Sequence, residues 1–102
     1  MVKLNYPSER IREFCERWEV AELALFGSAV RADFGAGSDV DVLVSFPAGV
    51  RWGLREWVKM EEELEQIFGR PVDLVSRAAV ERSPNYIRRR HILGSLERVY
   101  VA

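Results

Sequence analysis

Two apolar segments of strand length, separated by a short glycine-containing stretch, are the most constraining feature of the chain. The first, residues 23–26, stops at Gly27-Ser28, and ten residues further on the second segment carries Asp39 and Asp41. Glycine adopts backbone conformations closed to other residues and lets a ligand approach closely. A strand that runs through Gly-Ser into a helix N-terminus presents free N–H groups, which suit a phosphate. Ser28 is also a good helix cap, so a purely structural role stays open for it.

The second segment brings two carboxylates together. Alternation along a strand directs Asp39 and Asp41 to one face and the valines beside them to the other. Two carboxylates about 4 Å apart repel by roughly 4 kcal/mol at an effective dielectric of about 20, unless a cation lies between them. Hard oxygen ligands beside a phosphate favour Mg²⁺. The simpler alternative for Asp39 is a turn role after Ser38, which the paired Asp41 disfavours.

Gly27-Ser28, the gap of ten residues and Asp39-Val40-Asp41 resemble the signature of the nucleotidyltransferase superfamily, which has the DNA polymerase β-like fold. With Arg31 and Ser38 also in place, the segment is most similar to the minimal nucleotidyltransferase (MNT) branch. Many members of that branch are antitoxins paired with HEPN-domain toxins. Gly-Ser and Asp-x-Asp are each weak signals alone, and their combination at this spacing is specific.

A third carboxylate, Asp73, lies within a later apolar run at 72–75. An acid there is costly unless it is paired or bound to a metal. If this run lies beside the strand of Asp39 and Asp41, three carboxylates converge, and three acids can hold two Mg²⁺ ions. The resemblance implies that Asp39 and Asp41 bridge both ions, while Asp73 holds the catalytic one and helps remove the acceptor proton. Capping a helix or pairing with an arginine is the alternative role of Asp73.

The resemblance also implies a nucleotide site. Gly27 and Ser28 would hold the β- and γ-phosphates of a nucleoside triphosphate, with help from Arg31, and Ser38 would belong to the same site. Arg31 is the weakest of the four, because an exposed helical arginine is commonplace. The reaction would be in-line attack of a hydroxyl on the α-phosphorus, assisted mainly by positioning and charge neutralisation.

The sequence predicts an α/β (α+β) fold in which a small mixed sheet of three or four strands is flanked by helices. Helical spacing of apolar residues and the stop signals of Gly and Pro give the bounds. Helices are expected over 8–18, 28–33, 52–68 and, starting at Ser76 or Ser83, up to about 93; strands are expected over 21–26, 39–46, 72–75 and 99–101. On the long helix, the expected buried face is Leu54, Trp57, Met60, Leu64 and Ile67-Phe68, and the expected solvent face is Glu61, Glu62, Glu63 and Glu65.

The composition, with 48% hydrophobic and 30% charged residues, is that of a globular chain. At 102 residues we expect one nucleotidyltransferase domain over 1–102. No apolar run is long enough to span a membrane, and the N-terminus lacks a signal-peptide core. The single Cys15 cannot form an internal disulfide, which favours a cytoplasmic location. It also lies on an apolar helical stripe, which indicates a buried side chain rather than a catalytic thiol.

The net charge of −1 conceals an asymmetry. Residues 1–76 carry nine basic and fourteen acidic side chains, whereas residues 77–102 carry six and two. This basic quarter suits RNA, nucleotide phosphates or an acidic partner surface, and local pairing of its arginines is equally compatible. We interpret His91 as a surface residue rather than a base, and Tyr86 and Tyr100 as packing aromatics rather than modification targets.

Three functions in different classes follow. The first is an Mg²⁺-dependent protein adenylyltransferase, which the resemblance implies would move AMP from ATP onto a tyrosine of a cognate HEPN toxin and so act as a type VII antitoxin. The second is a non-catalytic antitoxin that neutralises its partner by contact. The third is a nucleotidyltransferase acting on RNA. For a transferase, the acceptor surface is expected from a partner, a second copy in a homo-oligomer, or a shallow groove near the basic quarter.

Overall fold

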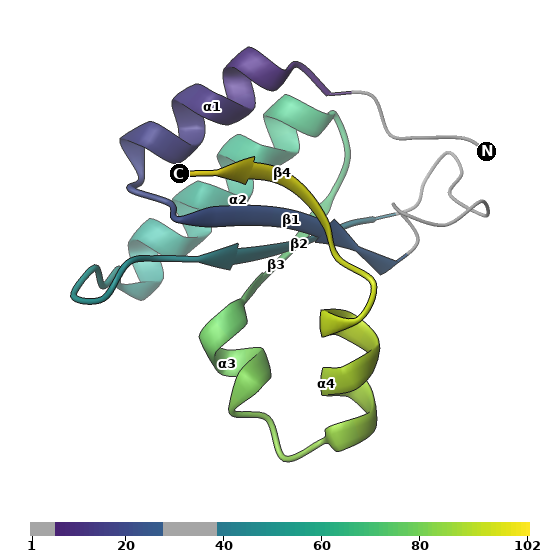
Figure 1. The fold of residues 1–102 in the computed structure, drawn as a ribbon. Coiled ribbons are helices and arrows are strands. Elements are labelled where there is room, and N and C mark those ends of the chain that lie inside the picture. Colours follow the sequence, from purple (N-terminus) through teal and green to yellow (C-terminus); the bar gives the residue numbers. More distant parts are fainter. Residues whose placement is uncertain (1–5, 28–38) are drawn as a thin grey trace.

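The structure, a computed structural model, describes residues 6–27 and 39–102. Within these ranges, four strands form one sheet and helices flank it (Figure 1). The elements are α1 (Ser8–Arg17), β1 (Glu22–Phe26), β2 (Val40–Ser45), α2 (Leu54–Phe68), β3 (Val72–Ser76), α3 (Arg77–Glu81), α4 (Tyr86–Leu93) and β4 (Glu97–Val101). The helix predicted over 28–33, together with Ser28, Arg31 and Ser38, lies outside the described residues.

The strands form a mixed sheet in the order β3-β2-β1-β4. The central strand β1 is antiparallel to both β2 and β4, whereas β2 and β3 are parallel. Parallel neighbours need a crossover connection, and α2 supplies it. The predicted α+β class, with a small mixed sheet flanked by helices, is confirmed.

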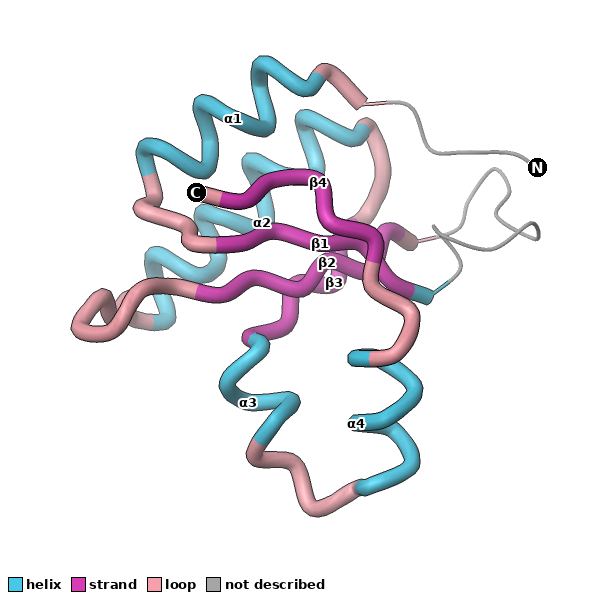
Figure 2. Tube along the Cα trace, viewed as in Figure 1, coloured by secondary structure: helices cyan, strands magenta, loops and turns pink. Residues whose placement is uncertain are grey.

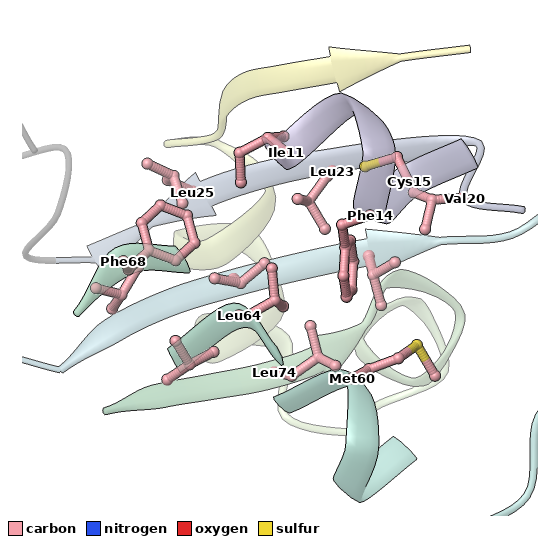
Figure 3. Packing of buried hydrophobic residues seen from close by; sticks show 14 residues of the cluster. Ile11, Phe14, Cys15, Val20, Leu23, Leu25, Met60, Leu64, Phe68 and Leu74 are labelled. Carbon is pink, nitrogen blue, oxygen red and sulfur yellow. The ribbon is translucent and has the colours of Figure 1, made fainter. Parts of the chain in front are cut away.

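Helices cover both faces of the sheet (Figure 2). The larger core lies under α1 and α2 and contains the alternate β2 residues Val40, Val42 and Val44. Figure 3 shows Phe14 of α1 and Leu64 of α2 within this core. The smaller core lies under α3 and α4 and consists of Phe26, Leu43, Val80 and Ile92. The period-two alternation of β2 therefore separates the two cores.

The prediction for Cys15 is confirmed. Its side chain is fully buried in the core beneath α1, and burial raises the pKa of the thiol to about 12. A thiol that stays protonated is a poor nucleophile, so Cys15 acts as a small apolar side chain. None of the helices in the described part of the chain has the length and apolarity needed to cross a membrane.

Helix α2 begins at Leu54, two residues later than predicted. The Gly53 N–H donates to the Glu56 carboxylate at 2.9 Å, which fixes the first turn. The prediction that Leu54 is buried is wrong, since its side chain is 80% exposed. The helix first meets the core one turn later, where Trp57 packs against it.

The prediction that the α2 glutamates face only solvent is also wrong. Strand β3 is an edge of the sheet, and two of its N–H groups donate to α2 side chains. Val72 donates to Glu65 at 3.1 Å and Leu74 to Glu61 at 3.3 Å. An unpaired strand edge is a template for unwanted pairing. The two carboxylates therefore satisfy and cover this edge.

The two C-terminal helices begin at different caps. Ser76 caps α3 as predicted, accepting from the Ala79 N–H at 3.4 Å. The predicted start at Ser83 is wrong for α4, because the Ser83 hydroxyl accepts from the Asn85 N–H in a turn. Asn85 is the cap of α4 and accepts from the Arg88 N–H at 3.0 Å.

We expect the double variant Glu61→Ala/Glu65→Ala to be less stable by roughly 1–3 kcal/mol, because two half-buried strand N–H groups lose their acceptors. Urea unfolding followed by circular dichroism measures this difference. Glu62→Ala on the exposed side of α2 is the matched control, with an expected change within about 0.5 kcal/mol. Equal stability of the double variant and the control would show that these bonds contribute nothing.

Candidate functional site

Two of the three predicted carboxylates lie at partner positions on neighbouring strands. In the parallel pairing of β2 with β3, Asp41 is opposite Asp73. Partner residues point to the same side of a sheet, and adjacent strands lie about 4.8 Å apart. The condition under which the sequence brings these two acids together, that their strands lie side by side, is met for Asp41 and Asp73.

Gly27 makes close contact with one of these acids. It follows Phe26, which is the antiparallel partner of Asp41, and it has φ +69°. A Cβ atom on residue 27 would lie 2.2 Å from Oδ2 of Asp41, so the carboxylate occupies the space that any other residue would fill. The special backbone conformation predicted for Gly27 is confirmed, whereas its contact with a phosphate stays a prediction.

The three acids differ in exposure. Asp41 is half-buried, whereas Asp39, immediately before β2, and Asp73 are exposed. The expectation that Asp73 occupies a costly buried position is therefore wrong. The small core on this face includes Leu43 and has Val75 packed against it, and both residues lie farther along the strands. This arrangement leaves the beginning of β3 open to solvent.

The carboxylate oxygens of this site are the type of ligand that a hard divalent cation binds. Carboxylate oxygens are the ligands that Mg²⁺ prefers, and Asp41 and Asp73 present theirs from neighbouring strands. Within residues 6–27 and 39–102, no group of three or more His, Cys, Asp or Glu side chains is close enough to hold a metal ion. The pair is thus a partial ligand set, and a joint metal role for Asp39, Asp41 and Asp73 stays a prediction.

Sequence reasoning missed two residues that support this site. The N–H groups on either side of Asp73 are those bound by Glu65 and Glu61, at 3.1 and 3.3 Å. Both glutamates follow directly after buried residues of α2, Met60 and Leu64. Glutamates spaced i, i+4 beside a buried stripe lie at its boundary with solvent rather than on the far face. Their position beside the buried stripe could have indicated that Glu61 and Glu65 reach the edge of the sheet.

Two arginines of the basic C-terminal quarter pair with an acid of β1. Arg77 and Arg98 both donate to the Glu22 carboxylate, at 2.7 and 2.5 Å. The hydrogen bond from Arg98 is the largest cause that holds the pKa of Glu22 below its ordinary value. This group ties β1 to β4 and α3. The alternative of local pairing on a helix holds for Arg77, which also donates to Glu81 of α3 at 3.1 Å, whereas Arg98 pairs across the sheet.

The predictions for Tyr100 and His91 agree with the structure, whereas the prediction for Tyr86 does not. Tyr100 packs against the large core as predicted, whereas Tyr86 is 58% exposed and is not a packing residue. His91 is exposed, which agrees with its interpretation as a surface residue.

Comparison with known proteins relates the chain to the nucleotidyltransferase domain family. The model of the nucleotidyltransferase domain family matches residues 8–96. The protein adenylyltransferase MntA of Thermococcus cleftensis is 39% identical over 70 residues, which are 69% of this chain and 69% of the relative. A Methanocaldococcus jannaschii protein, provisionally assigned as a protein adenylyltransferase, is 32% identical over 64% of this chain and 65% of its own.

Solved structures share the fold. A structure provisionally assigned as a minimal nucleotidyltransferase has a TM-score of 0.67 and 28% identity, and the match covers 88% of this chain and 86% of that one. A toxin–antitoxin crystal structure with AMP-PNP has a TM-score of 0.70 and 18% identity, over 93% of this chain and 73% of that one. At such identity the second likeness shows the fold alone.

We expect Gly27→Ala to disturb the site beyond the cost of a positive φ, because the new methyl group must displace the Asp41 carboxylate. Gly69→Ala is the matched control, since Gly69 also has φ +69° but no atom within 4 Å of its Cβ position. Strain should cost either variant about 1–3 kcal/mol. Overpacking should cost Gly27→Ala roughly 1–3 kcal/mol more.

Urea unfolding measures the stabilities, and Mn²⁺ titration by electron paramagnetic resonance measures cation binding. We expect weaker Mn²⁺ binding in Gly27→Ala only. Equal stability and equal Mn²⁺ affinity in the two variants would contradict the contact with Asp41.

Proposed function

Because the chain belongs to the nucleotidyltransferase domain family, we propose that it is an Mg²⁺-dependent protein adenylyltransferase, acting as one domain over residues 1–102. The observation that carries the proposal is the placement of Asp41 opposite Asp73, with the Asp41 carboxylate against Gly27. This brings two carboxylates to the turn where the sequence pattern predicts a triphosphate. A nucleotidyl transfer needs both features at one place.

In this proposal Asp39, Asp41 and Asp73 hold the metal ions. Bound Mg²⁺ would neutralise triphosphate charge and favour ionisation of the acceptor hydroxyl. The residues proposed to bind the nucleotide are Gly27, Ser28, Arg31 and Ser38. The glycine lets the triphosphate approach the backbone closely, and the serines and arginine offer hydrogen-bond donors to its oxygens.

The reaction is an in-line displacement at the α-phosphorus of ATP. The acceptor oxygen forms a bond to this phosphorus as the bond to the bridging oxygen breaks, and pyrophosphate leaves. The hydroxyl proton passes to the Asp73 carboxylate, whose exposed position allows an acceptor to approach. The adenylate ends on the acceptor oxygen, and charges balance without a further reactant.

We further propose that the acceptor is a tyrosine of a HEPN-domain toxin in the same cytoplasm, which the modification inactivates. Support comes from the relative named as the protein adenylyltransferase MntA, and the toxin–antitoxin structure with AMP-PNP contributes the shared fold. The chain is then a type VII antitoxin. An antitoxin that acts by contact alone is the alternative that the next experiment separates.

We expect Asp41→Asn to abolish modification of the partner without unfolding the chain, because the amide keeps the shape and removes the ligand charge. The protein encoded beside this chain is co-expressed with it, and its intact mass is measured. The wild-type chain should add one or more adenylates, and transfer should fall by about 100-fold or more in the variant.

Glu62→Gln removes an exposed acid remote from the site and is the matched control, with full transfer expected. An unmodified partner that is still neutralised by both wild type and Asp41→Asn would overturn the enzyme in favour of a contact antitoxin. Nucleotide added to RNA instead of protein would overturn the protein acceptor.

We also expect transfer to stop when EDTA removes divalent cations and to return when Mg²⁺ or Mn²⁺ is restored, since carboxylate pairs bind such ions. Radiolabelled ATP measures both steps. Transfer that continues at full rate in excess EDTA would contradict the metal role of the acids.

A further inference from the structure

Helix α4 carries apolar residues in two places. Within the described residues, one set is buried against the sheet and the other is exposed. Ile92 is buried and Leu93 is partly buried, and both pack in the small core beneath the sheet. On its first turn, Tyr86 is 58% and Ile87 79% exposed. A helix that serves only to cover a sheet needs one apolar stripe. The second apolar site on α4 therefore needs another explanation.

The same helix carries a run of cations. Arg88, Arg89 and Arg90 precede the exposed His91, and α4 contains no acidic residue. Among the described residues, no ion pair involves any of these arginines. They differ in this from Arg77 and Arg98, which pair with Glu22.

The exposed aromatic ring is held in place by this run. The Arg89 guanidinium lies 5.6 Å from the Tyr86 ring centroid, and Arg90 donates to the Tyr86 hydroxyl at 3.3 Å. Beside it lies a surface hollow of about 480 Å³. Its lining is Tyr86, Ile87, Arg90, His91, Gly94 and Ser95.

This surface lies on the same side of the sheet as the carboxylates. Ile92 of α4 packs in one cluster with Phe26, which is the partner of Asp41 and precedes Gly27. Figure 1 shows α4 beneath the sheet, on the side where β1 ends. The beginning of α4 lies at the end of the helix away from the sheet (Figure 1). A helix of 8 residues is about 12 Å long, and a bound protein is large enough to extend over that length toward the carboxylates.

We propose that the α4 surface, defined as Tyr86, Ile87, Arg88, Arg90 and His91, docks the acceptor protein through an acidic patch with an apolar side chain in the hollow. The inference rests on the proposed function and names the place where that partner binds. The positive charges of Arg88 and Arg90 favour an acidic patch on the partner. Ile87 and Tyr86 supply the apolar contact.

The same features favour a protein over RNA. Single-stranded RNA binds through aromatic rings that stack on bases. The most exposed apolar residue here is the aliphatic Ile87, and one face of the Tyr86 ring is taken by Arg89.

The test is Ile87→Glu/Arg90→Glu in the full chain, with Leu54→Glu/Arg55→Glu as the matched control. The control makes the same kinds of change on α2, where Leu54 is 80% exposed. The neighbouring gene product is purified in unmodified form, and adenylate transfer to it is measured as a function of acceptor and of ATP concentration. We expect the acceptor KM to rise about tenfold or more in the α4 variant, with the ATP KM unchanged and the control like wild type.

Unchanged acceptor KM in the α4 variant, or an equal loss in the control, would overturn the docking surface while leaving the enzyme intact. Binding of the same gene product is also measured by calorimetry. Binding that depends on α4 without any transfer would support the surface and overturn the proposed activity. Loss of RNA binding in the α4 variant, with protein binding retained, would overturn the inference in favour of RNA.

Discussion

The parallel pairing of β2 with β3 determines where the carboxylates of the candidate site lie. Val40 pairs with Val72 and Val42 with Leu74, and all four are buried in the large core. A slip of one residue would turn every side chain of a strand to the other face. Asp41 would then enter that apolar core, at the high cost of a buried unpaired charge. The hydrophobic effect on one face therefore fixes the positions of the acids on the other.

Contacts at both sides of the acid pair reinforce this register. On the β1 side, Gly27 leaves room for the Asp41 carboxylate. On the outer edge, Glu61 and Glu65 bind the N–H groups that flank Asp73. This face of the sheet thus combines the half-buried Asp41 and the exposed Asp73 with strands that are held by β1 on one side and by α2 side chains on the other. Preorganisation of this kind is what a charge-stabilising site requires.

Local pattern in the sequence predicted much of this arrangement. The alternation of residues 39–46 predicted a strand that carries Asp41 on the face opposite to its valines, whereas the strand of Asp73 was its neighbour only as a condition. Exposure of Asp73 and the contacts of the glutamates could not be predicted in this way. The exposure of Asp73 depends on where the small core lies on its face of the sheet, and the contacts of the glutamates depend on β3 being an edge strand. Both are properties of the tertiary arrangement rather than of periodicity. The start of α4 was missed for a local reason, because Ser83 and Asn85 are both suitable caps.

The most direct test of the account is a crystal structure of the chain with Mn²⁺ and a non-hydrolysable ATP analogue, analysed by anomalous scattering. The account predicts an Mn²⁺ peak bound by Asp41 and Asp73, with the phosphates of the analogue beside Gly27. An analogue bound elsewhere, or a cation that contacts neither aspartate, would contradict it.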